Sequence, residues 1–165
     1  MKITFQGGEV HLEGVSLVEG AKAPDFTGVK TDLSPWSLKD AGDTVKIISS
    51  VPSLDTPVCD VQTKRFNKEA ASLPGVTVVT VSLDLPFAQA RWCAAANANS
   101  HIVLSDYAER DFGKKFGTLI KELKLLTRAV FVLDKNNVVK YVQYVPEITN
   151  EPDYEAAIKV AKELL

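Results

Sequence analysis

The chain has 165 residues, of which 45% are hydrophobic and 24% charged, and these values predict one globular domain, residues 1–165, with a full hydrophobic core. The net charge of −2 provides no electrostatic basis for binding nucleic acid or an anionic membrane surface. No segment is apolar for long enough to span a bilayer, and the N-terminal residues lack the apolar region of a secretory signal, so we expect a cytoplasmic protein.

The beginning of the chain is predicted to form short strands. Hydrophobic residues alternate between residues 3 and 12 on both sides of Gly7-Gly8, a pattern that predicts a β-hairpin with a structural role. Two further short strands are predicted at residues 26–30 and 34–38. The residues at 40–43, which include Asp and Gly, indicate a turn.

The next stretch combines a buried strand with the start of a helix. Residues 45–51 are rich in β-branched side chains, which is typical of a buried strand. Turn-forming residues follow, and Pro57 then opens a helix that extends to about residue 73 and is stopped by Pro74-Gly75. Thr56 before Pro57 is the order expected for an N-cap followed by proline at the first helical position. The apolar face of this helix is predicted to consist of Val58, Val61, Phe66, Ala70 and Leu73.

The remainder of the chain alternates between strands and helices. Residues 76–83 are almost continuously β-branched, which predicts a central strand covered on both faces. Asp84 is placed to cap a second helix, which carries Trp92 and Cys93 and ends in a small, polar tail at residues 94–99. The other predicted elements are a strand at 101–104, a helical or irregular segment around 109–116, a hairpin of strands 128–133 and 138–145, and an amphipathic helix at 153–165. This order predicts an α/β protein with helices packed on a mixed central sheet.

Cys59 occupies the third position of the predicted first helix. Unpaired backbone amides and the positive end of the helix dipole stabilise a thiolate there, and such a cysteine can have its pKa lowered from about 8.5 to roughly 3.5–7.5. The competing interpretation is that Cys59 and Cys93 are inert buried residues, which is common for cysteines in such chains. The two are too far apart for a C-x-x-C pair and too few for a zinc site, and His11 and His101 have no ligand-spaced neighbours.

Three residues give Cys59 a specific environment. Thr56 lies one helical turn earlier, which predicts that its hydroxyl lies beside the sulfur. Pro52 would shape the preceding turn and shield the sulfur from solvent, and Arg128, at the start of a strand, is a candidate cation to hold a thiolate and orient an oxygen substrate. Each residue alone has a simple structural explanation, but together they form a pattern.

The stretch from Pro52 to Cys59 resembles the P-x-x-x-T-x-x-C motif of the peroxiredoxins, and it is most similar to the thiol peroxidase subfamily, the atypical two-cysteine group. The resemblance extends along the whole chain and includes the N-terminal hairpin and the segments 23–26, 62–67, 91–93 and 126–132. One departure is Trp92, because the family more often carries phenylalanine there.

The resemblance implies a thioredoxin-like fold with a central mixed β-sheet flanked by helices and an N-terminal β-hairpin, with no metal or organic cofactor. It implies that Cys59 is the peroxidatic cysteine, that Thr56 and Arg128 activate it, and that Cys93 is the resolving cysteine of an intrachain disulfide. It also implies hydrogen peroxide and organic hydroperoxides as substrates, thioredoxin as the electron donor, and a homodimer.

The disulfide imposes a geometric condition, because its two Cα atoms must lie within about 7 Å. Cysteines on two neighbouring helices need not meet this condition. We therefore predict that the helix turn around Cys59, the segment around Cys93, or both unwind between half-reactions. The weakly anchored tail at residues 94–99 is the expected place for this loosening.

Two other functions use the same chemistry. A dithiol carrier or disulfide reductase would share the fold, but the absence of C-x-x-C argues against rapid exchange between paired cysteines. A redox sensor or chaperone-like protein would need a client protein, which the sequence does not reveal. Peroxide consumption supported by a thioredoxin system separates the three functions.

Overall fold

The computed structural model describes residues 1–96 and 102–165. Its centre is a seven-stranded mixed sheet, which confirms the predicted architecture. The strands lie in the order β11 (Val139–Tyr144), β10 (Ala129–Leu133), β6 (Val45–Ser50), β7 (Val76–Ser82), β8 (Ile102–Ser105), β4 (Thr27–Lys30) and β5 (Pro35–Ser37). Strands β6, β7 and β8 are parallel, and the other neighbours are antiparallel. The continuously β-branched strand β7 is the central one, as its composition predicted.

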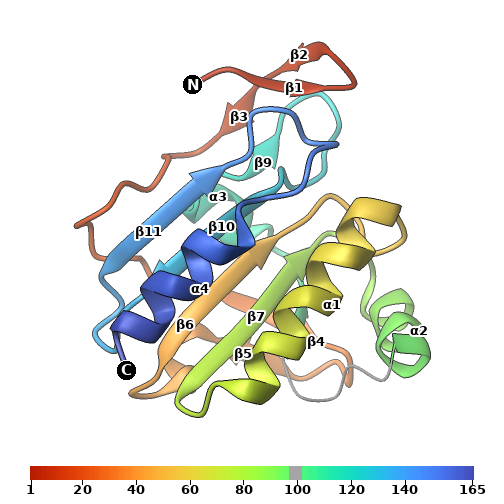
Figure 1. Ribbon diagram of the computed structural model, residues 1–165. Coiled ribbons are helices and arrows are strands. Elements are labelled where there is room, and N and C mark those ends of the chain that lie inside the picture. Colours follow the sequence, from red (N-terminus) through yellow and green to blue (C-terminus); the bar gives the residue numbers. More distant parts are fainter. Residues whose placement is uncertain (97–101) are drawn as a thin grey trace.

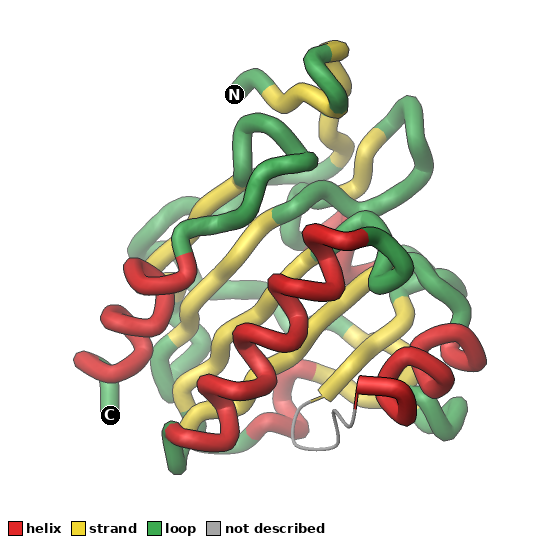
Figure 2. Tube along the Cα trace, turned by 45° about the vertical axis from the view of Figure 1, so that its right-hand side comes forward, coloured by secondary structure: helices red, strands yellow, loops and turns green. Residues whose placement is uncertain are grey.

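Two long helices cover one face of this sheet. Helix α1 (Pro57–Ser72) and helix α4 (Tyr154–Glu163) lie side by side over the sheet in both views and run roughly along its strands (Figures 1 and 2). The ring of Phe66 in α1 packs edge-on against Tyr154 in α4, with centroids 5.4 Å apart. Asp153 caps α4 by accepting a hydrogen bond from the Ala156 amide. The terminal amphipathic helix is therefore confirmed, and α1 is the helix that carries Cys59.

An aromatic cluster fills the opposite face of the sheet. Phe26, Phe112, Phe116 and Phe131 stack or meet edge to face, and the alternation of strand residues separates this cluster from the core under α1 and α4. The segment predicted as helical or irregular forms the short helix α3 (Asp111–Lys115).

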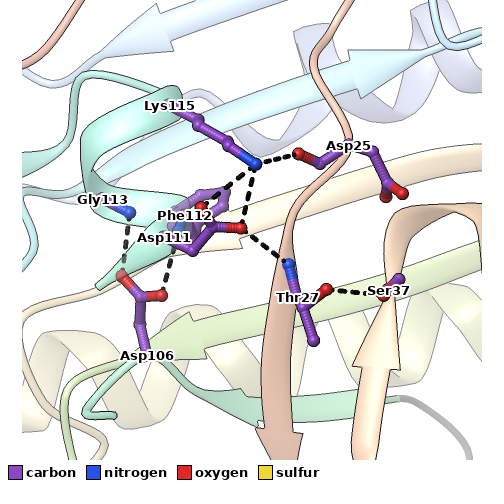
Figure 3. Close-up of polar contacts among 8 residues, drawn as sticks. All are labelled: Asp25, Thr27, Ser37, Asp106, Asp111, Phe112, Gly113 and Lys115. Atoms are coloured by element: carbon purple, nitrogen blue, oxygen red, sulfur yellow. Dashed lines mark hydrogen bonds and ion pairs between the residues drawn. The ribbon is translucent and has the colours of Figure 1, made fainter. Parts of the chain in front are cut away.

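Two carboxylates attach helix α3 to its surroundings, one from the preceding loop and one from the helix itself (Figure 3). Buried Asp106 accepts hydrogen bonds from the amides of Phe112 at 3.0 Å and Gly113 at 2.8 Å. Asp111 accepts from the Thr27 amide at 3.0 Å, which ties α3 to strand β4. A Cβ at position 113 would lie 3.0 Å from Leu126 Cδ2 and 3.2 Å from Asp106 Oδ2, so the helix approaches its neighbours closely there.

The predicted hairpin at the N-terminus is confirmed, with different limits. Strands β1 (Ile3–Phe5) and β2 (Gly8–Val10) are antiparallel, and the turn between them uses positive φ angles of 50° at Gln6 and 82° at Gly7. The chain then forms β3 (Leu12–Glu13), which pairs with β9 (Leu119–Ile120), a strand that the sequence pattern did not reveal. At residues 38–41 the structure has a 3₁₀-helix where a strand end and turn were predicted.

Helix α2 (Pro86–Ala96) follows β7 and stands at the side of the molecule, away from α4 (Figure 1). At the opposite edge of the sheet, the turn between β10 and β11 is closed by Asp134, whose Oδ1 accepts from the amides of Asn136 and Val138. In the two ranges that the structure describes, no helix is long and apolar enough to cross a membrane.

Candidate active site

Cys59 is the third residue of α1, as the sequence predicted, and its side chain is fully buried. The first helical hydrogen bond of this turn runs from the Asp60 amide to the Thr56 carbonyl at 2.9 Å. Amides earlier in the turn have no partner within the helix, because the ladder has not yet begun. The sulfur therefore lies at the positive end of a sixteen-residue helix, where negative charge is stabilised.

Arg128 directs its guanidinium to this sulfur from the residue before strand β10. Its Nη2 donates to Cys59 Sγ at 3.2 Å, Nη1 donates to Gln62 Oε1 at 2.8 Å, and Nε donates to the Ile148 carbonyl at 2.6 Å. Only 2% of Arg128 is exposed. Three nitrogens of the rigid guanidinium thus have separate partners, and its positive charge is held in contact with Cys59.

Gln62 completes this contact, and the sequence interpretation did not assign it a role. It is fully buried one turn after Cys59, and its Nε2 donates to Ser49 Oγ at 2.6 Å while its Oε1 accepts from Arg128. The predicted apolar face was wrong at Val61, which is 49% exposed. Helix α1 instead buries Cys59, Gln62, Thr63 and Phe66, so its inward face includes polar residues that serve the site.

Thr56 and Pro52 border a pocket that leads to Arg128. Thr56 immediately precedes α1, as expected, and its hydroxyl donates to the Ser53 carbonyl at 3.1 Å. The pocket has a volume of about 270 Å³. Its lining is mostly apolar and consists of Phe5, Gln6, Pro52, Thr56, Pro57, Val58, Arg128, Ile148 and Thr149. The N-terminal hairpin therefore contributes to this pocket through Phe5 and Gln6, beyond the purely structural role predicted for it.

Asp84 fixes the turn before Cys59, and it does not act through the predicted cap of α2. Its carboxylate accepts from Ser53 Oγ at 2.7 Å, the Leu54 amide at 2.8 Å and Ser82 Oγ at 2.7 Å. These bonds connect the turn to the end of β7. The sequence pattern suggested a cap because Asp84 precedes a helix. Two of its actual partners, Ser53 and Leu54, lie 31 and 30 residues away in the chain and have no local signature.

Cys93 lies on α2 and is partly buried next to Trp92. Both residues pack against a cluster of Val51, Leu54, Cys59 and Val103, so the two cysteines share one apolar environment although they come from different helices. Burial raises the pKa of the Cys93 thiol. Neither cysteine is in a disulfide. Of the tail predicted to loosen, residues 94–96 are helical and 97–99 lie outside the described residues.

The histidines show no metal site in the described ranges, where no group of three or more potential ligands occurs. His101 lies outside those ranges. The His11 amide donates to Glu122 Oε2 at 2.9 Å, and the His11 ring contacts the other oxygen of this carboxylate at 2.5 Å. Residues 121–124 are all exposed, so this contact lies on a solvated face of the molecule.

Comparisons with known proteins agree with this arrangement. The model of the redoxin family matches residues 18–158. A thiol peroxidase of Halalkalibacterium halodurans is 55% identical over 163 residues, covering 99% of this chain and 98% of the relative, and one of Bacillus subtilis is 53% identical over 164 residues, with coverage of 99% and 98%. A solved structure of a peroxiredoxin-like protein from Aquifex aeolicus has a TM-score of 0.94 at 45% identity, covering 99% of this chain and 97% of that one.

The mixed sheet with flanking helices and an added hairpin is the peroxiredoxin form of the thioredoxin-like fold. The chain belongs to the redoxin family and, within it, to the thiol peroxidases, the atypical two-cysteine peroxiredoxins. It is accordingly an enzyme, a peroxiredoxin-type peroxidase.

Proposed function

We propose that this peroxidase reduces hydrogen peroxide and organic hydroperoxides through Cys59, with Cys93 as the resolving cysteine and a thioredoxin as the electron donor. The observation that carries the proposal is the contact of 3.2 Å between Arg128 Nη2 and Cys59 Sγ, at the positive end of α1. A buried guanidinium and the amides at a helix start both stabilise negative charge close to them, and the thiolate is the nucleophilic form of cysteine.

In the first step, the Cys59 thiolate attacks one peroxide oxygen and the O–O bond breaks. The sulfur becomes a sulfenic acid, and the other oxygen leaves as water or as an alcohol after taking up a proton. Arg128 and the amides at the start of α1 stabilise the negative charge that develops on the oxygens. Thr56 orients the peroxide at the pocket, and Pro52 forms a wall that limits access of water to the sulfur.

In the second step, Cys93 attacks the sulfenic sulfur, an S–S bond forms, and the oxygen leaves as water. Because burial raises the pKa of Cys93, this residue waits as a thiol and supplies the proton that the departing oxygen needs. The Cα atoms of a disulfide lie within about 7 Å of each other, so we propose that α1, α2 or both unwind locally for this step. The dithiol of thioredoxin then reduces the disulfide by exchange and is itself oxidised.

The setting of this reaction is also part of the proposal. Recycling by a dithiol requires a reducing compartment, which supports a cytoplasmic location. We further propose that residues 1–165 act as one domain and that the enzyme is a homodimer, as the resemblance to its family implies.

The test is peroxide consumption in the presence of thioredoxin, thioredoxin reductase and NADPH. We expect steady turnover by the wild type and none by Cys59→Ser. Cys93→Ser should consume one equivalent of peroxide and then stop, because its sulfenic acid has no resolving thiol. Consumption by Cys59→Ser at the wild-type rate would falsify the proposal. Reduction of insulin disulfides without peroxide consumption would instead identify a dithiol reductase.

A further inference from the structure

A hydrogen bond joins the two helices that carry the cysteines. Trp92 Nε1 in α2 donates to Asp60 Oδ1 in α1 at 2.8 Å. Asp60 directly follows Cys59, and Trp92 directly precedes Cys93. We refer to this contact as the Asp60–Trp92 bridge. It therefore connects the neighbours of both sulfurs.

The second half of α2 has few other attachments. The first half is anchored by buried Pro86 and by Gln89, whose Nε2 donates to Ser82 Oγ at 3.0 Å and to the Leu104 carbonyl at 2.8 Å. In residues 91–96, the bond from Trp92 is the only side-chain hydrogen bond to another described residue. Arg91, Ala94 and Ala95 are exposed. Apart from this bond, the half of α2 that carries Cys93 is held by the packing of Trp92 and Cys93.

The bridge is specific to the helical form of both segments. Asp60 lies in the first turn of α1 and Trp92 in the second half of α2, so their side chains meet only while both helices keep their backbone geometry. If either segment unwinds, donor and acceptor separate. Asp60 also pairs with Lys64 at 2.9 Å, but this ion pair lies within α1, and the side chain of Lys64 is 53% exposed. It orients the carboxylate without connecting the two helices.

We propose that Asp60 and Trp92 are positioning residues that slow disulfide formation by holding both helices in the folded form. This inference rests on the proposed function, in which the sulfenic acid at Cys59 and the thiol of Cys93 give a disulfide and water. The competing reaction is attack by the sulfenate on a second hydroperoxide, which gives a sulfinate and an alcohol or water. By lengthening the life of the sulfenate, the bridge makes the enzyme more sensitive to inactivation at high peroxide.

The test separates the two chemical steps by rapid mixing with hydrogen peroxide, acid quench and intact-mass measurement of the thiol, sulfenic, disulfide and sulfinic forms. Trp92→Phe keeps the aromatic packing and removes the donor. We expect its disulfide step to be faster by about threefold to tenfold, the factor that one hydrogen bond of ordinary strength represents. The rate of the first step should be unchanged, and the sulfinate yield at high peroxide should fall by a similar factor.

Matched variants assign the effect to the bridge. Asp60→Ala should match Trp92→Phe, and the double variant should show no further increase. Asp60→Asn keeps an acceptor oxygen and should stay near the wild-type rate, as should Lys64→Ala, which removes only the ion pair within α1. A fast disulfide step in Asp60→Asn or Lys64→Ala would overturn the inference, since charge would then be the cause.

The same measurements distinguish this inference from the proposed function. If the wild type forms no sulfenic acid with peroxide, the proposed function fails, and this inference fails with it. If the sulfenic acid forms but Trp92→Phe closes its disulfide at the wild-type rate, only the inference about the bridge is overturned. Circular dichroism spectra that match the wild type would show that the variants are folded.

Discussion

At the scale of single residues, Arg128 is the group whose geometry matters most, because three of its nitrogens contact three different partners. A lysine has one nitrogen and cannot reproduce this arrangement. We expect Arg128→Lys to slow the reaction of Cys59 with peroxide by about 100-fold, the cost typical of removing a donor that stabilises developing charge. Stopped-flow kinetics of the first step would measure this. Arg110→Lys, a change at an exposed arginine, is the control and should react at the wild-type rate.

Gln62 supports Arg128 from the position one helical turn after Cys59. Gln62→Leu would leave Ser49 Oγ and Arg128 Nη1 without their partner in a fully buried place. We expect a loss of about 1–3 kcal/mol in the free energy of unfolding, because buried polar groups without a partner are costly. Urea denaturation would measure this loss. The neighbouring change Val61→Leu, at a position that is 49% exposed, should leave stability nearly unchanged, and equal losses in the two variants would contradict the role given to Gln62.

At the scale of elements, the N-terminal hairpin is attached to the site through Glu147. Its Oε1 accepts from Thr4 Oγ1 at 2.9 Å and the Gly7 amide at 2.8 Å, and its Oε2 accepts from the Thr149 amide at 2.9 Å. The next residue, Ile148, provides the carbonyl that holds Arg128 Nε. Glu147 thus connects the hairpin wall of the pocket to the segment that positions the guanidinium.

Removal of this carboxylate should loosen the hairpin selectively. We expect Glu147→Ala to increase amide hydrogen exchange in β1 and β2 by about tenfold, because several bonds are lost together. Helix α4 should retain its protection. Glu163→Ala, at an exposed glutamate in the last turn of α4, is the control. Unchanged exchange in β1 and β2 of Glu147→Ala would show that the hairpin does not depend on this carboxylate.

The sequence predicted those elements that have a strong local pattern. The β-branched runs located β6, β7 and β10, and proline after threonine located the start of α1 and hence the position of Cys59. It failed where partners are distant in the chain, because no local periodicity encodes them. Three features are of this kind because they arise only when the chain folds. They are the pairing of the two-residue strand β9, the hydrogen bonds that Asp84 accepts from the turn before Cys59, and the contact of Ile148 with Arg128.

At the scale of the whole molecule, stability depends on pH through carboxylates with opposite shifts. Burial raises the pKa of Asp106 to about 6, above its ordinary 3.8, so its contribution to stability is full below about pH 4 and is lost as the pH rises through 6. Backbone hydrogen bonds lower the pKa of Glu147 to about 2. The contribution of Glu147 is therefore present above its ordinary pKa of 4.5 and is lost as the pH falls toward 2.

Asp106→Asn should remove the part of the pH dependence of stability that comes from Asp106 and leave the part that comes from Glu147. We expect the rise in unfolding free energy between pH 7 and pH 4 to be smaller in this variant by about 2–3 kcal/mol, the size that corresponds to the shift in Asp106. The fall at lower pH should persist because Glu147 is unchanged. Urea denaturation at a series of pH values would measure both the rise between pH 7 and pH 4 and the fall at lower pH. An identical slope between pH 4 and 7 in the variant and the wild type would refute the assignment to Asp106.

The Asp60–Trp92 bridge also gives the enzyme a built-in fluorophore. The chain has two tryptophans: Trp36 is buried in the hydrophobic core with Phe26, whereas Trp92 lies on α2 and packs beside Cys93 in a separate cluster. Indole emission responds to a neighbouring carboxylate and is quenched by a nearby disulfide, so Trp92 should change its emission when Cys93 is oxidised, whereas Trp36 should not. In a Trp36→Phe variant, the fluorescence of Trp92 would then report the redox state of the enzyme in real time, without a label or a coupled enzyme.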